Sequence, residues 1–217
     1  MVFDLEKEAL TASGVTDRDL MISYIDKLRC LHRQFSRQSS LQENPHDIAR
    51  ELFKWLWKGR RFRYRPRGNF LLHKVLDSQL DRKMPPVGNC LGLTLLYNCL
   101  LIRMGIDAEA LYIHNAFGIG PHVLTLLRMG DQRIDVENIF SDGFNYPGHL
   151  KHPLRVRWGS QELVAEIYNS LGNLCFEQGR LQKALRNYDM ALGVSRNHEM
   201  AGLNKLILLD KMKESGQ

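Results

Sequence analysis

The sequence PPVGNCLGLTLLYNCLLIRMG, residues 85–105, decides the fold of this chain. Its two prolines and first glycine end whatever element precedes, and Asn89 is a residue type that commonly caps the N-terminus of a helix. The following residues are apolar on almost every side as far as Met104, as in a helix buried in a core, and Gly105 ends the run. This stretch therefore predicts a central, buried helix that begins just after Asn89.

Cys90 falls in the first turn of this predicted helix. Unpaired backbone amides and the positive end of the helix dipole favour a thiolate over a thiol at such a position. Cys90 is therefore a candidate nucleophile. The alternative is a small buried apolar residue, which is what most free cysteines are.

Composition limits the class of protein. The chain has 217 residues, of which 44% are hydrophobic and 25% charged, enough for one domain with a core and a small appendage. It has no window of about 18 uncharged apolar residues, so we expect no membrane-spanning segment. The N-terminus MVFDLEKE does not resemble a secretory signal, so we expect a cytoplasmic protein. The net charge of +6 permits contact with nucleic acid without requiring it.

The cysteines and histidines predict no cofactor. The four cysteines lie far apart, without a CxxC pair and without histidines at zinc-ligand spacing. His149 and His152 form a short pair with no further ligand nearby in the sequence. We therefore predict neither a disulfide framework nor a metal site, and no cofactor.

A helical flank is predicted at the N-terminus, over residues 1–43. Thr16, with Asp19 three residues later, has the spacing of a capping box. Apolar residues then recur at three- and four-residue steps through Phe35, which indicates one apolar helix face.

A domain over residues 44–159 is predicted to hold the core. Asn44-Pro45 supplies an N-cap and a first-turn proline for another helix. Beyond the central helix, Gly130-Asp131 is a turn signal between two apolar runs, which predicts an antiparallel hairpin. The elements expected are helices from residue 45 and over 69–80, and strands over 106–113, 122–128 and 133–138. The fold class is therefore α+β, with the central helix packed on a small antiparallel sheet.

Residues 58–67 carry six basic and two aromatic residues in ten. Guanidinium groups bind phosphate and aromatic rings stack on bases, so this segment is the best candidate for RNA or DNA binding. A short arginine-rich loop is more often solvated surface, and we do not expect nucleic acid as a partner.

Residues 160–217 return to helical periodicity. The order of Tyr168, Leu171-Gly172, Ala184 and Tyr188 matches the offsets of a tetratricopeptide repeat. A single repeat cannot bury both faces, so we expect this segment to dock on the preceding domain or on a protein partner.

A nucleophilic cysteine needs a base within hydrogen-bond reach and a group that orients the base. His122 opens a core strand and is the best-placed histidine, although strand histidines are more often structural. Asp135 on the partner strand is the candidate orienting carboxylate. A two-residue turn would place Asp135 opposite Leu126, roughly 13 Å along the strand from His122, so a shifted register, or Glu137 or Asn138 in its place, stays open.

Together, the motifs GNCLGLTLLY (88–97), GPHVL (120–124) and IDV (134–136) resemble the transglutaminase-like superfamily of cysteine hydrolases and acyltransferases. The NFLLHKVLD segment (69–77) and the repeat-like C-terminus resemble the bacterial branch that couples this core to tetratricopeptide repeats.

This resemblance implies a thiol-dependent hydrolase or acyltransferase acting on amide bonds of a peptide or protein substrate. It implies Cys90 as nucleophile, His122 as general base and then acid, and Asp135 as the orienting residue. Asn89 and Asn69 are candidate oxyanion donors beside the Cys90 backbone amide. The alternative is a non-catalytic interaction or scaffold protein on the same fold, with the repeat binding a partner.

Overall fold

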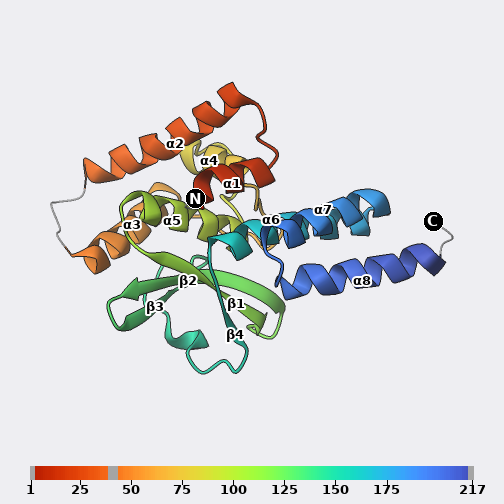
Figure 1. Ribbon diagram of the computed structural model, residues 1–217. Coiled ribbons are helices and arrows are strands. Elements are labelled where there is room, and N and C mark those ends of the chain that lie inside the picture. The colour runs from red at the N-terminus through yellow and green to blue at the C-terminus, as the bar shows by residue number, and fades with distance from the viewer. Residues whose placement is uncertain (1–2, 39–43, 215–217) are drawn as a thin grey trace.

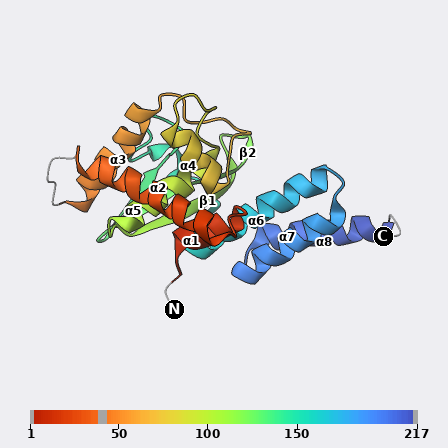
Figure 2. The same cartoon turned by 90° about the horizontal axis from the view of Figure 1, so that it is seen from above.

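The computed structural model describes residues 3–38 and 44–214. A layer of helices covers a central helix, which in turn lies on a four-stranded antiparallel sheet, and the C-terminal helices extend to one side (Figure 1). The view from above shows the same separation between the C-terminal helices and the rest (Figure 2). The chain is therefore α+β, as predicted. Among the described residues, no helix combines the length and apolarity needed to cross a membrane.

The helices are α1 (Leu5–Ala12), α2 (Arg18–Ser36), α3 (Pro45–Gly59), α4 (Leu72–Leu80), α5 (Cys90–Arg103), α6 (Ser160–Glu177), α7 (Leu181–Val194) and α8 (Glu199–Glu214). The strands are β1 (Ala108–Ala116), β2 (Gly120–Met129), β3 (Gln132–Val136) and β4 (Arg155–Trp158), with a short 3-10 helix, η1 (Pro147–His149), between β3 and β4.

The central helix α5 begins and ends close to where the sequence predicts. The Asn89 side chain accepts a hydrogen bond from the Gly92 amide at 3.0 Å, which confirms Asn89 as the N-cap. Every residue from Leu91 to Leu101 is buried. A helix enclosed on all sides in this way is fixed by its neighbours, so the position of its first turn is fixed as well.

The sheet has the strand order β3-β2-β1-β4, and each neighbouring pair is antiparallel. Met129 pairs with Gln132, so the predicted two-residue turn at Gly130-Asp131 is confirmed. The hairpin of β1 and β2 instead has an irregular register between Ile113 and Ala116. α5 packs against β2 and β1, which brings the start of β2 close to the start of the helix.

The structure differs from the sequence analysis in two features of the N-terminal helices, the N-cap of α2 and the presence of α1. The N-cap of α2 is Asp17, whose carboxylate accepts from the Leu20 amide at 2.8 Å, and not Thr16. The helix α1 was not predicted, because its eight residues are too few to give a clear apolar period. Its C-cap residue Ser13 accepts a hydrogen bond from the Leu72 amide at 2.8 Å and so caps α4 from a distant part of the chain.

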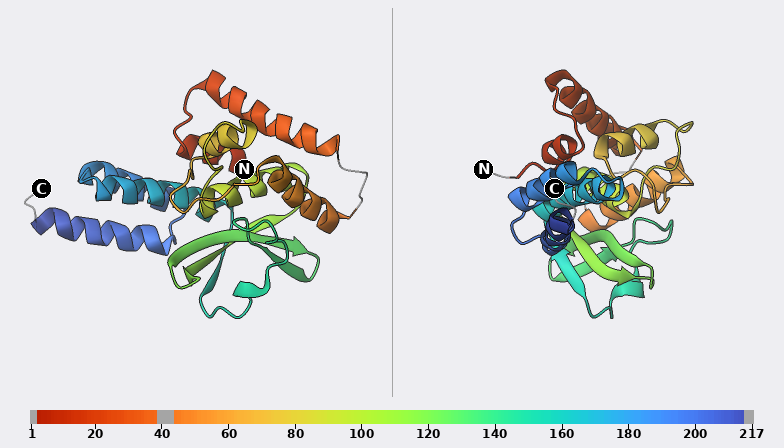
Figure 3. Two further views of the ribbon diagram at one scale, coloured as in Figure 1. Left: turned by 180° about the vertical axis from the view of Figure 1, so that it is seen from behind. Right: turned by 90° about the vertical axis from the view of Figure 1, so that its right-hand side faces the viewer.

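The C-terminal helices α6, α7 and α8 pack in sequence, and α6 also contacts α1 (Figure 3). Gly172 in α6 faces the ring of Tyr188 in α7, and an added Cβ there would lie 2.3 Å from a ring carbon. The glycine is therefore required for the close approach of these two helices.

The arginine-rich segment is partly structural. Arg60 donates hydrogen bonds to the backbone carbonyls of Ser78, Asp81, Met84 and Pro85. Arg63 is fully buried, with its Nε 3.3 Å from Gln79 Oε1 and its guanidinium 5.4 Å from the Trp57 ring centroid. The basic side chains left exposed are Lys58, Arg61, Arg65 and Arg67.

Candidate active site

Cys90 is the first residue of α5 and is partly exposed. The preceding loop is held by a backbone hydrogen bond of 2.9 Å from the Asn89 amide to the Asn69 carbonyl. A Cβ at Gly88 or Gly92 would lie 2.7 or 2.4 Å from that same carbonyl oxygen. Two glycines thus allow the chain at Asn69 to lie directly against the first turn of α5, which fixes the backbone that carries the Cys90 thiol.

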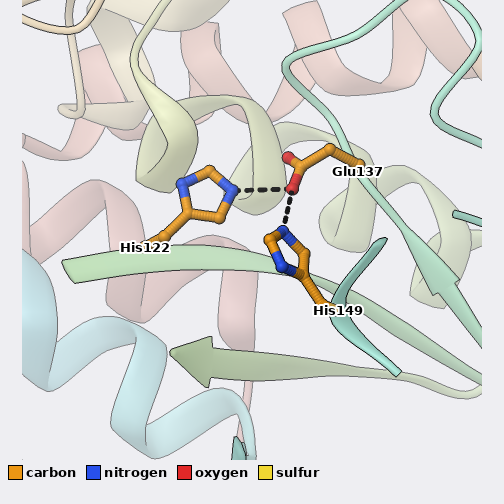
Figure 4. A group of neighbouring side chains, drawn as sticks. All are labelled: His122, Glu137 and His149. Atoms are coloured by element: carbon orange, nitrogen blue, oxygen red, sulfur yellow. Dashed lines mark hydrogen bonds and ion pairs between the residues drawn. The ribbon is translucent and has the colours of Figure 1, made fainter. Parts of the chain in front are cut away.

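His122 is the third residue of β2. It lies beside the N-terminus of α5 and is 5% exposed. Its Nε2 lies 2.8 Å from the Oε2 atom of Glu137, a fully buried carboxylate just after β3 (Figure 4). The Cys90 side chain lies close enough to the same imidazole to be one of the groups that raise its pKa. Because Glu137 occupies Nε2, Nδ1 is the ring nitrogen that remains for Cys90. The structure therefore brings together a thiol, an imidazole and a carboxylate in that order.

The ionisation of this group follows from its partners. Burial alone would lower the pKa of His122, but hydrogen bonds and charge from Cys90 and Glu137 outweigh it and raise the pKa from 6.5 to about 10. Burial would raise the pKa of Glu137, but hydrogen bonds from His122 and His149 outweigh it and lower that pKa. The arrangement therefore favours an imidazolium next to an ionised carboxylate and the sulfur atom.

Asp135 is placed differently from the sequence prediction. It pairs with Leu126 in the sheet, four residues along β2 from His122, as the two-residue turn requires. Its carboxylate accepts a hydrogen bond from Arg155 Nη2 at 2.8 Å, and burial raises its pKa despite that arginine. Glu137, one of the alternatives left open by the sequence, is the carboxylate that bonds His122 instead.

Asn138, the other alternative, belongs to a separate buried network. Its amide nitrogen donates to Thr125 Oγ1 at 2.9 Å and to Thr94 Oγ1 at 3.2 Å. Thr125 in turn donates to Asn98 Oδ1 at 2.6 Å. These bonds join α5 to β2 and therefore fix the helix on the sheet.

The two asparagines named as oxyanion candidates have different surroundings. The carboxamide oxygen of Asn89 caps α5, which leaves its amide nitrogen for other use. The amide nitrogen of Asn69 donates to Ser78 Oγ at 3.4 Å. Asn69 thus contributes to the site through its backbone carbonyl, whereas Asn89 directly precedes Cys90 in the chain.

Two side chains near the site were not predicted from the sequence. His149, in η1, is 3% exposed, and its Nε2 lies 3.2 Å from Glu137 Oε2 (Figure 4). Tyr64 pairs with Gly88 in an isolated bridge, and its pKa is raised by burial and then by charge on Cys90 and Glu137. Both lie in irregular segments where no hydrophobic period marks them, although Tyr64 falls within the arginine-rich stretch.

His122, Glu137 and His149 are also the described residues that could hold a metal ion. Their donor atoms all lie within 4.8 Å of one another.

Comparison with protein-family models, with curated proteins and with solved structures finds no match. The function is therefore argued from the geometry of the site.

Proposed function

We propose that the chain is a thiol-dependent hydrolase or acyltransferase with a transglutaminase-like core, in which Cys90, His122 and Glu137 form the catalytic triad. The observation that carries the proposal is the buried pair of His122 and Glu137, 2.8 Å apart, next to the first turn of α5, which carries the Cys90 thiol. Nucleophilic thiol catalysis requires a base next to the sulfur and a group that orients the base. The substrate class proposed is an amide or ester of a peptide or protein.

Before the reaction, the Cys90 thiol gives its proton to Nδ1 of His122, which forms a thiolate and an imidazolium. In the first half of the reaction, the thiolate sulfur attacks the carbonyl carbon. The tetrahedral intermediate then collapses, the bond to the leaving amine breaks, and His122 returns the proton to that amine. The product is a thioester on Cys90. In the second half, water or an acceptor amine attacks the thioester, His122 takes its proton, and the sulfur departs to regenerate the enzyme.

Glu137 has the orienting part in this scheme. Because a carboxylate only accepts hydrogen bonds, its 2.8 Å contact requires the hydrogen on Nε2 of His122, which leaves the Nδ1 lone pair for the thiol proton. The Ile139 backbone amide donates a hydrogen bond to Glu137 Oε1 at 3.4 Å, which also helps to fix the orientation of the carboxylate. The oxyanion would be met by the Cys90 backbone amide, with the amide nitrogen of Asn89 as a second donor.

The proposal is tested by trapping the acyl-enzyme. p-Nitrophenyl acetate carries a reactive acyl group of general use, and we expect a rapid release of nitrophenolate together with acetylation of Cys90, located by mass spectrometry of the digested protein. Cys90→Ser should abolish both. Acetyl groups spread equally over Cys90 and the partly exposed Cys30 would contradict a dedicated nucleophile.

A second candidate function is a non-catalytic interaction protein. The observation in its favour is an apolar face on α8, where Leu203, Leu206 and Ile207 are 50%, 63% and 50% exposed at helical spacing. For this function, association with a protein partner should survive Cys90→Ser and be lost in Leu206→Asp, measured by pull-down with the tagged full chain. Loss of association in Cys90→Ser would count against it.

A further inference from the structure

His149 gives the site a feature that the triad does not use. Its Nε2 and that of His122 both point at the same oxygen, Oε2 of Glu137, at 3.2 and 2.8 Å (Figure 4). All three side chains are at least nine-tenths buried, at 5%, 0% and 3% exposed for residues 122, 137 and 149. Two imidazoles and one carboxylate thus converge from β2, the turn after β3 and η1.

The position of His149 is determined by more than this one contact. Arg155 of β4 donates to the His149 carbonyl at 2.9 Å and to the Asp135 carboxylate at 2.8 Å, which ties η1 to the sheet. The ring of Phe117 lies 4.7 Å from the His149 ring and 5.5 Å from the His122 ring, between centroids. The second histidine is therefore held toward Glu137 by both backbone and side-chain contacts.

Two of the three donor separations are close to those of a transition-metal site, and the third, between the two imidazole nitrogens, is within 4.8 Å. Around a tetrahedral Zn²⁺ with bonds of about 2.0–2.1 Å to nitrogen and oxygen, neighbouring donors lie about 3.3 Å apart. The two observed donor separations of 2.8 and 3.2 Å need to widen by only a few tenths of an ångström. Two imidazoles and one carboxylate leave one coordination position open and are a donor set that suits Zn²⁺ and similar ions.

We propose that His122 Nε2, His149 Nε2 and the Glu137 carboxylate form a binding site for a divalent transition metal such as Zn²⁺, and that the bound metal suppresses the reactivity of the Cys90 thiol. The proposal that these residues bind a metal does not depend on catalysis. The proposal that the metal lowers the reactivity of Cys90 rests on the proposed function. An imidazole that binds metal through Nε2 carries its single hydrogen on Nδ1. His122 then has no lone pair with which to take the Cys90 proton, so metal and triad compete for the same ring.

Aromatic side chains cover the two histidines, and Tyr146 packs against His149 with 5.2 Å between the ring centroids. Phe117 lies over both imidazoles and is 43% exposed, at a position of positive φ (54°) in the turn between β1 and β2.

The full chain, freed of metal by dialysis against a chelator, is titrated with Co²⁺ followed by absorption and with Zn²⁺ followed by calorimetry. We expect one ion per chain in the unmodified protein and in Cys90→Ser. His149→Gln and Glu137→Gln should each weaken metal binding more than about tenfold. Loss of a residue that only hydrogen-bonds to a metal ligand already weakens binding about 10- to 100-fold. His152→Gln is the matched control, because that histidine contacts the Asn115 carbonyl at 3.2 Å outside the cluster, and it should bind as the unmodified protein does.

Alkylation of Cys90 by iodoacetamide supplies the second readout. Zn²⁺ at one equivalent should slow it in the unmodified protein and not in His149→Gln, whose folding is checked by circular dichroism. Absence of one-to-one binding, equal binding by His149→Gln, or loss of binding in Cys90→Ser would overturn the metal site. If Cys90 is no more reactive than Cys30 before metal is added, the proposed function fails, whereas one-to-one binding lost in His149→Gln would still support the metal site.

Discussion

The substitution Glu137→Gln tests which carboxylate serves His122. Glutamine keeps the shape of the side chain but replaces the charged acceptor by one neutral oxygen and one donor group. One carboxylate oxygen, Oε2, now lies 2.8 Å from His122 Nε2 and 3.2 Å from His149 Nε2, and a neutral amide oxygen in its place gives neither contact the strength that a charged acceptor provides. The change therefore removes the charge that holds the imidazolium.

The size of the effect follows from that lost bond. A hydrogen bond to a charged group contributes about 1.5–3 kcal/mol. If it stabilises the imidazolium that forms when Cys90 loses its proton, its loss corresponds to a decrease in rate of about ten- to a hundredfold. We expect alkylation of Cys90 by iodoacetamide at neutral pH to slow by that factor.

The assay uses the other thiols as internal standards. Labelling of each cysteine is followed by mass spectrometry of the digested protein, and Cys30, which is partly exposed on α2, should keep its rate. The matched control is Asp135→Asn, the same change of chemistry at a buried carboxylate that bonds Arg155. This control should alter the rate at Cys90 by no more than about twofold. An unchanged Cys90 rate in folded Glu137→Gln, or an equal decrease in Asp135→Asn, would refute the assignment of Glu137.

Two further substitutions test the packing that supports the site. Gly172→Ala places a Cβ 2.3 Å from the Tyr188 ring and should reduce the free energy of unfolding by about 1–3 kcal/mol, whereas Gly193→Ala in α7, with no atom within 4 Å of the added Cβ, should leave it unchanged or raise it by up to about 1 kcal/mol. Equal effects of the two changes in urea unfolding would contradict this packing. Ser13→Ala removes the buried hydrogen bond to the Leu72 amide and should cost about 1–2 kcal/mol in the same measurement. A loss below about 0.5 kcal/mol would show that this cap of α4 is not needed.

The central helix and the hairpin could be predicted because local chemistry determines them. An unbroken apolar run after Asn89 has few alternatives to a buried helix, and the turn at Gly130-Asp131 gives the register of β2 and β3. That register also indicated that Asp135 lies too far along the strand to bond His122. The structure places Asp135 opposite Leu126 and pairs its carboxylate with Arg155.

The rest of the candidate site depends on contacts between distant segments. Glu137 reaches His122 because the chain turns after β3, where the Glu137 amide donates to the Gly143 carbonyl at 2.8 Å. His149 lies in η1, whose position depends on Arg155 in β4. The four residues of β4 are too short and too polar to show a strand period, so neither β4 nor the role of His149 could be predicted from the sequence.

The most direct measurement is the rate of Cys90 alkylation in the unmodified protein and in His122→Ala, with Cys30 as the reference in the same sample. The proposed triad requires Cys90 to react much faster than Cys30 near neutral pH, and His122→Ala to lose most of that advantage while the rate at Cys30 stays the same. Equal, slow labelling of both thiols in the unmodified protein, or an unchanged Cys90 rate in His122→Ala, would contradict the proposal that this imidazole activates the thiol.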